Sequence, residues 1–218
     1  MTRPGVFFPE DDPELLALVR PPGWTNPTPR AEYDLVVIGG GAAGLVCAIG
    51  AAGLGARVAL VERHRLGGDC LNTGCVPSKA LAAVARVAVG DSPQQRLENA
   101  RLVFRQRRTQ LAPHDSASRL TGMGIDLFFG QAAFTGPANV VVESATLRFR
   151  KAALCAGASP ALPDIPGLAD CQPLTTDTFF DLDRLPASLA IVGAGPVGVE
   201  LAQSLARLGC SVTLVEQG

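Results

Sequence analysis

Two cysteines, Cys70 and Cys75, are the residues of this chain best suited to carry chemistry, because they are close neighbours in the sequence. They lie in the stretch GGDCLNTGCVPSK, which runs from Gly67 to Lys79 and follows a glycine-rich turn of the kind that binds dinucleotides. A structural disulfide closing so short a loop would contribute only roughly 2 kcal/mol in the chain-entropy model. We therefore predict that the pair is a redox couple, oxidised and reduced by a neighbouring cofactor.

The glycine-rich turn occurs twice, at an offset of 154 residues. In each copy an apolar β-like run leads into the turn, an alanine-rich helix follows, and a second apolar run ends in a glutamate. The first copy consists of Gly39, Gly41, Ala42, Ala43, Gly44 and Glu62, and the second of Gly193, Gly195, Gly198 and Glu216. A single GxGxxG motif is weak evidence, but two copies in complete strand–turn–helix–strand context strongly indicate nucleotide binding.

Each position of the motif has a physical reason. The first glycine permits the tight turn, the second lets the backbone approach a pyrophosphate, and the third allows the helix to pack closely on the strand. The helix N-terminus faces the phosphate charge, and the glutamate accepts hydrogen bonds from a ribose diol. Two copies predict two dinucleotides, and the carboxylate of Glu216 favours NADH over NADPH because it would repel a 2′-phosphate.

Composition limits the classes of function. The chain has 218 residues, 47% of them apolar, and a net charge of −1, so it offers no electrostatic footprint for nucleic acid. The basic residues Arg105, Arg107 and Arg108 are interpreted as a solvated helix face. Zinc binding is disfavoured because His64 and His114 are the only histidines.

The N-terminus lacks the features of a signal peptide, and glycines interrupt the apolar residues 35–61, which leaves too short a helix to cross a bilayer. We expect a soluble, cytoplasmic protein without a membrane partner.

The predicted fold is α/β, with two Rossmann-like units and a small antiparallel meander over residues 124–155. A helix is expected from Val76 to about Val89. The predicted organisation is an extended arm at 1–30, a first nucleotide domain with the dithiol at 31–160, a linker at 161–187 and the start of a second nucleotide domain at 188–218.

With the first turn, the dithiol stretch and the second turn in this order, residues 32–218 resemble the N-terminal portion of the class I pyridine nucleotide–disulfide oxidoreductases. The sequence of the dithiol stretch is most similar to that of the mercuric-reductase-like branch, and dihydrolipoamide dehydrogenase is the alternative. The resemblance implies FAD in the first site and NADH (or NADPH) in the second. Electrons would pass through the flavin to a Cys70–Cys75 disulfide, with Cys75 as the flavin-side thiol. Cys70 would be the interchange thiol that meets a metal-ion or disulfide substrate.

The resemblance also implies roles for further residues. Lys79 would lie by the flavin and pair with Glu200. Contacts with FAD are implied for Gly68, Ala132 and Gly157, with Ala132 in the segment on the adenine side of the cofactor. The position of Cys75 at a helix start independently favours a thiolate, because unpaired N–H groups gather there.

Three positions depart from the family pattern. Asp69 and Ala156 stand where threonines are usual, and Pro196 replaces an aromatic residue that gates the nicotinamide pocket in some members. The chain also lacks the N-terminal metal-binding module of many mercuric reductases. Metal ions and organic disulfides therefore both stay open as substrates.

The second nucleotide unit ends directly after its second strand, and two parallel strands with one helix cannot cover both faces of a sheet. We expect these residues to be the N-terminal part of a chain of roughly twice the length, which the resemblance implies is a homodimer. Two other classes stay open: a non-catalytic nucleotide-binding fragment, and a flavoprotein monooxygenase or NADH oxidase without disulfide chemistry.

Overall fold

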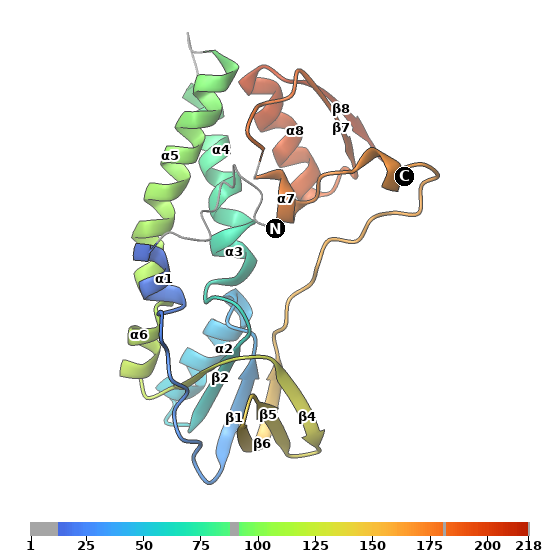
Figure 1. Cartoon of the computed structure of the whole chain (residues 1–218). Coiled ribbons are helices and arrows are strands. Elements are labelled where there is room, and N and C mark those ends of the chain that lie inside the picture. The colour runs from blue at the N-terminus through green and yellow to red at the C-terminus, as the bar shows by residue number, and fades with distance from the viewer. Residues whose placement is uncertain (1–12, 88–91, 181, 218) are drawn as a thin grey trace. The chain divides into compact units, whose positions relative to one another are not determined.

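The computed structural model describes residues 13–87, 92–180 and 182–217 (Figure 1). Its contacts divide the chain into two compact units. The first unit consists of Asp11–Leu71 and Thr109–Ser159, and the second unit contains Asn72–Arg108 and Pro160–Gly218.

The first unit is built on a six-stranded sheet with the order β3-β2-β1-β6-β5-β4. Its strands are β1 (Tyr33–Ile38), β2 (Val58–Glu62), β3 (Asp126–Phe129), β4 (Ala132–Gly136), β5 (Asn139–Val142) and β6 (Ala145–Leu154). The first four strands in the sheet order pair in parallel, and β6, β5 and β4 pair antiparallel. Strand β2 is buried along its whole length, as its unbroken apolar run predicts.

The predicted meander over 124–155 is correct only for β4, β5 and β6. Strand β3 pairs in parallel with β2 instead. The ten-residue strand β6 serves both parts of the sheet, because its first half pairs with β5 and its second half with β1. Its length allows one strand to bridge the parallel and antiparallel halves.

The N-terminal arm is not wholly extended. Within the described residues it begins with α1 (Pro13–Val19), whose Leu15 and Val19 are buried. The other helical segments of this unit are α2 (Ala42–Gly53), most of α3 (Gly68–Asn72), the short 3-10 turn η1 (Ala112–Asp115) and α6 (Ala117–Gly122). Helix α2 connects β1 to β2, which completes the predicted strand–turn–helix–strand unit.

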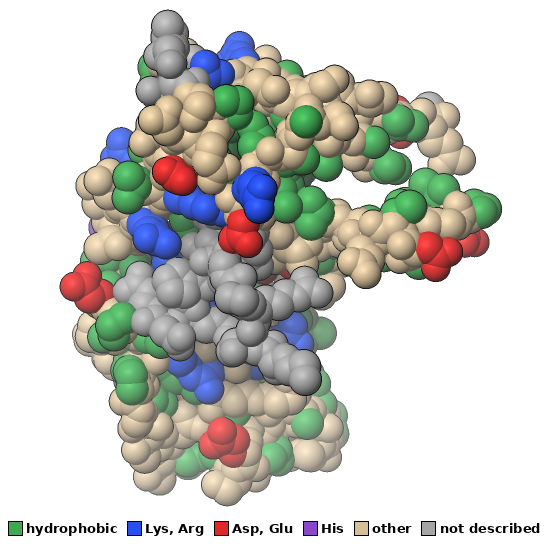
Figure 2. All heavy atoms as spheres, turned by 45° about the horizontal axis from the view of Figure 1, so that its top comes forward, with side chains coloured by type: hydrophobic (Ala, Val, Ile, Leu, Met, Phe, Trp, Pro, Cys, Tyr) green, Lys and Arg blue, Asp and Glu red, His purple; other side chains and the backbone are tan. Residues whose placement is uncertain are grey.

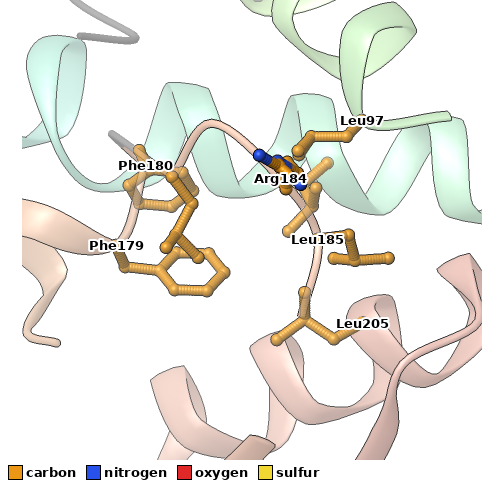
Figure 3. Close-up of a pocket in the computed structure, with 8 residues that line it drawn as sticks. Leu97, Phe179, Phe180, Arg184, Leu185 and Leu205 are labelled. Atoms are coloured by element: carbon orange, nitrogen blue, oxygen red, sulfur yellow. The ribbon is translucent and has the colours of Figure 1, made fainter. Parts of the chain in front are cut away.

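The second unit contains α4 (Cys75–Val87), most of α5 (Pro93–Leu111), η2 (Ala169–Cys171), α7 (Thr176–Phe179) and α8 (Pro196–Leu208), with a two-stranded parallel sheet of β7 (Ser188–Val192) and β8 (Ser211–Val215). Helix α4 begins one residue before its predicted start. An apolar cluster joins the helices α4, α5, α7 and α8 and the two strands, as Figure 3 shows for Leu97 of α5, Phe179 of α7 and Leu205 of α8.

The interpretation of the basic cluster on α5 is wrong for one residue. Arg105 and Arg107 are exposed, but Arg108 is only 1% exposed. Its guanidinium carbon lies 4.9 Å from the ring centroid of Phe104, a cation–π contact that compensates part of the cost of burial. On the face shown in Figure 2, basic side chains lie among acidic and hydrophobic ones. Within the described segments, no helix has the length and apolar character needed to cross a membrane.

Candidate dinucleotide and dithiol site

The first glycine turn leaves no room for side chains at two positions. Gly39 has a φ of +107°, and an added Cβ would lie 2.1 Å from the carbonyl oxygen of Cys155. A Cβ on Gly44 would lie 1.7 Å from the carbonyl oxygen of Gly39. The Gly39 N–H donates to the Val61 carbonyl at 2.8 Å, which ties the turn to the end of β2. Both glycines are therefore required by close backbone approach.

The start of α2 is open to an anion. Gly41 is its N-cap residue and supplies no side-chain cap, so the N–H groups of the first turn, at Ala42 and Ala43, have no capping side chain. Gly68 lies directly against Gly41, where an added Cβ would meet the Gly41 Cα at 2.6 Å. The result is a cradle lined by backbone with N–H donors at a helix N-terminus, which fits a pyrophosphate.

Glu62 is placed beside this cradle. Its side chain is 8% exposed and both carboxylate oxygens accept backbone hydrogen bonds. Oε2 accepts from the Gly40 N–H at 2.6 Å, and Oε1 accepts from the His64 N–H at 2.6 Å. Each oxygen can accept a further bond, so the carboxylate is oriented and still able to receive a ribose hydroxyl.

The second turn repeats these bonds at the predicted offset. The Gly193 N–H donates to Val215 at 2.8 Å, and the Ala194 N–H donates to Glu216 Oε2 at 2.5 Å. Gly193 has a φ of +104°, and a Cβ on Gly198 would lie 2.0 Å from the Gly193 carbonyl oxygen. Gly195 caps α8 without a side-chain hydrogen bond, as Gly41 caps α2. The sequence repeat is thus a repeat of hydrogen bonds.

The two cradles differ in their surroundings. Added Cβ atoms on Gly193 and Gly195 would meet no other atom within 4 Å in the described part of the chain. The corresponding Gly39 and Gly41 lie against Cys155 and Gly68. Glu216 is exposed, whereas Glu62 is buried. Within the described residues, the first turn therefore packs against other segments of its own unit, whereas Gly193 and Gly195 make no such contacts.

The two cysteines of the predicted couple belong to different units. Cys70 lies in α3 and is half-buried, and Cys75 is the first residue of α4 and is exposed. Their pairing stays a prediction. Within the first unit, Asp69 lies beside Gly157, whose φ is +72° and whose added Cβ would be 3.9 Å from Asp69 Oδ2.

The structure places Ala132 at the start of β4, where it pairs with Val142 of β5. Its contact with the adenine side of FAD stays a prediction, as does the FAD contact of Gly157.

Lys79 and Glu200 are brought together within the second unit. Lys79 Nζ lies 2.6 Å from Glu200 Oε2, and their side chains are 67% and 30% exposed. The ammonium of Lys79 holds the pKa of the Glu200 carboxyl below its ordinary value. Pro196, at the first position of α8, is pre-organised for a helix start and has no N–H to satisfy.

Helices α4 and α8 run side by side in the same direction. The Lys79–Glu200 pair joins their N-terminal halves. At the other end, Gly209 lies against Pro93, the first residue of α5, which follows α4 after a short connection (Figure 1). The N-termini of both helices, at Cys75 and Gly195, therefore lie at the same end of the pair, where their dipoles both favour negative charge.

A groove of about 580 Å³ lies along this helix pair. Besides Lys79, Glu200 and residues of the second turn, it is lined by Ala82, Arg86, Val199, Gln203, Ser204 and Arg207. The sequence interpretation missed these residues. Their spacing of three, four or seven positions from Lys79 or Glu200 could have placed most of them on the same helix faces as that pair. The apolar pocket of Figure 3 has only about 10 Å³ and is part of the core rather than a ligand site.

Comparison with known families identifies this architecture. Residues 33–218 match the model of the pyridine nucleotide-disulphide oxidoreductases. The chain belongs to this family. Its members pair a pyridine nucleotide with disulfide chemistry, and their cofactors are FAD and NAD(P)H. The glycine turns, acids and cysteines predicted from the sequence lie in the matched part of the chain.

Similar proteins carry several related names. The chain is 34% identical over 197 residues to a mercuric reductase of Lysinibacillus sphaericus, covering 85% of this chain and 36% of that protein. It is 32% identical to a dihydrolipoyl dehydrogenase of Acholeplasma laidlawii, covering 85% and 60%. The HOCl-induced flavoprotein disulfide reductase RclA from Escherichia coli aligns with a TM-score of 0.67 at 31% identity, covering 84% and 41%. The chain thus spans between about a third and two thirds of the length of these relatives.

Proposed function

We propose that this chain carries the two nucleotide sites and the redox dithiol of an NAD(P)H-dependent flavoprotein disulfide oxidoreductase. The observation that carries the proposal is the repeat of the cradle: the Gly40 and Ala194 N–H groups each donate to the acid that ends the second strand. Two such cradles fit two dinucleotides. The cysteine pair between them in the sequence supplies a group that two electrons can reduce.

When bound, FAD supplies a two-electron carrier between the pyridine nucleotide and the Cys70–Cys75 disulfide. In the balanced reaction NAD(P)H and one proton reduce the disulfide to two thiols, and the dithiol passes the electron pair to substrate and closes again. The residues of the chain orient the reactants: Glu62 and Glu216 accept ribose hydroxyls, and the starts of α2 and α8 face the pyrophosphates. The Lys79–Glu200 pair fixes a positive group one turn from Cys75.

For the substrate we propose a soft metal ion of the Hg(II) type, as in the mercuric reductases that the chain resembles. Dihydrolipoamide-type disulfide exchange is the second candidate, supported by the similarity to a dihydrolipoyl dehydrogenase. Steady-state NADH oxidation with Hg(II) or with lipoamide as the acceptor distinguishes the two. We also propose that the whole protein is a cytoplasmic homodimer, which size-exclusion chromatography with light scattering would test.

The proposal is tested by anaerobic titration of the flavin-loaded protein with NADH. A working couple develops a long-wavelength absorbance from a thiolate beside the flavin, and Cys75→Ser abolishes it. Cys70→Ser keeps this band and loses turnover, because Cys70 is the interchange thiol. Cys171→Ser is the matched control, since Cys171 is an exposed cysteine outside the dithiol stretch. A protein that takes up no FAD, or one whose band survives in Cys75→Ser, contradicts the proposal.

A further inference from the structure

Arg20 holds the loop that follows the acid of the first cradle. Its Nη1 donates to the carbonyl oxygens of Arg63 at 2.9 Å and His64 at 2.6 Å. The preceding residue, Val19, accepts a hydrogen bond from the Leu66 N–H at 3.0 Å. Two adjacent residues of the N-terminal arm thus bind three residues of the loop after β2.

Arg20 is itself fixed. Its N–H donates to the Leu16 carbonyl at 2.9 Å, at the end of α1, and its guanidinium carbon lies 4.6 Å from the ring centroid of Phe129. The Phe129 backbone exchanges two hydrogen bonds with the Asn26 side chain, at 2.8 and 2.9 Å. Trp24 packs edge-on against the same ring, with the centroids 5.6 Å apart. The guanidinium is therefore pre-organised rather than free to sample other rotamers.

The loop in turn orients Glu62. The backbone of His64 connects the arm to Glu62, because its N–H donates to Glu62 Oε1 while its carbonyl oxygen accepts from Arg20. The Leu66 side chain is fully buried against the turn, where a Cβ on Gly40 would meet Leu66 Cδ2 at 2.8 Å. A shift of the loop would therefore move a hydrogen-bond donor of the Glu62 carboxylate.

We infer that Arg20 is a positioning residue of the first nucleotide site: it fixes the loop that orients Glu62 toward the adenosine ribose of a bound dinucleotide. The inference rests on the proposed function, because it takes Glu62 as the ribose acceptor of the flavin site. Arg20 acts through the loop and touches no cofactor atom in this scheme. It extends the nucleotide site to an arm that precedes the family's matched region, residues 33–218.

The first test compares the dissociation constant for FAD in wild type and Arg20→Met. We expect about tenfold weaker binding in Arg20→Met, equivalent to about 1.4 kcal/mol. Arg20→Lys recovers part of the affinity, because the ammonium can still donate to a loop carbonyl. Arg30→Met is the matched control, since Arg30 lies in the same arm and pairs with Asp126 at 2.8 Å. Equal losses of affinity in Arg20→Met and Arg30→Met would show a general effect of the arm and overturn the inference.

A double-mutant cycle separates positioning from a merely structural role. If Arg20 acts through Glu62, adding Arg20→Met to Glu62→Gln weakens FAD binding by less than about twofold. A full, independent loss on the Glu62→Gln background overturns the inference. Faster amide hydrogen exchange at His64 and Leu66 in Arg20→Met is the accompanying structural readout. A wild-type protein that takes up no FAD refutes the proposed function, whereas wild-type FAD affinity in Arg20→Met refutes only this inference.

Discussion

Lys79 and Glu200 are each the fifth residue of a 13-residue helix, and their side chains meet at 2.6 Å. The ion pair therefore holds α4 and α8 in register. Cys75 begins one of these helices, and the second glycine turn leads directly into the other. The same contact that joins the helices thus relates the position of a predicted redox thiol to that of a nucleotide cradle.

This ion pair predicts an acid-dependent contribution to stability. Lys79 holds the pKa of Glu200 below its ordinary value of 4.5, so the stabilisation is complete above about pH 4.5 and is lost as the pH falls through the lowered value. Because both side chains contact solvent, the contribution at neutral pH should be about 0.5 kcal/mol. Urea unfolding of wild type and Glu200→Gln should show this difference at pH 7, and the difference should shrink as the pH falls below 4.5. Glu98→Gln, on the exposed face of α5, is the matched control for the removal of one carboxylate.

The close packing of the first turn predicts opposite effects for two glycines of α2. Gly44→Ala places a methyl group 1.7 Å from the Gly39 carbonyl oxygen, and should lower the free energy of unfolding by about 3 kcal/mol or more and abolish FAD binding. Gly50 has open space around its Cα, so Gly50→Ala should stabilise the protein by about 0.5–1 kcal/mol. Thermal unfolding and flavin content after purification measure both effects. Comparable destabilisation by the two variants would contradict the packing argument.

Tyr33 predicts a loss of stability in alkali. It is fully buried, and its hydroxyl donates to Asp126 at 2.9 Å. Burial raises the pKa of Tyr33 to about 12, above its ordinary value of 10. The neutral phenol therefore stabilises the fold fully below pH 10, and this contribution is lost as the pH rises from 10 to 12.

We expect the free energy of unfolding to fall by roughly 2 kcal/mol between about pH 10 and about pH 11.5. Tyr33→Phe should remove this dependence while lowering stability by about 1 kcal/mol at neutral pH. Denaturant titrations from pH 9 to 11.5 provide the measurement. An identical alkaline slope in both proteins would show that Tyr33 is not the titrating group.

Glu216 predicts the choice of pyridine nucleotide. Its carboxylate, held by the Ala194 N–H, should disfavour a 2′-phosphate, so kcat/KM for NADH should exceed that for NADPH by about tenfold or more. Glu216→Gln keeps a hydrogen-bond acceptor but removes the negative charge. It should therefore lower the ratio of kcat/KM for NADH to kcat/KM for NADPH. Glu62→Gln makes the same change in the first cradle and should leave that ratio unchanged. A ratio that shifts equally in both variants would argue against separate sites.

The glycine turns and their acids were predictable because the backbone of each turn is fixed by residues within the motif. Gly39 and Gly193 have nearly equal φ values, and the hydrogen bonds of Glu62 and Glu216 repeat at the predicted offset. The start of α4 followed in the same way from local sequence. Local chemistry was sufficient wherever the bonding partners belong to one strand–turn–helix–strand unit.

The remaining features depend on partners that are distant in sequence. Asn26 bonds to Phe129, more than a hundred residues away, so the arm could not be placed from its prolines alone. Arg108 is different, because its partner Phe104 is only four residues away: helical spacing places Arg108 on the buried face of α5 with Leu97 and Ala100, but its charge indicated exposure. The double pairing of β6 likewise follows from the sheet as a whole.

The close backbone contacts of the first turn limit the sequence variation that these positions can tolerate. A side chain at Gly39, Gly44 or Gly68 would meet main-chain atoms, which cannot move aside as the end of a flexible side chain can. Among variants selected at random for retained folding, these three positions should therefore accept glycine alone.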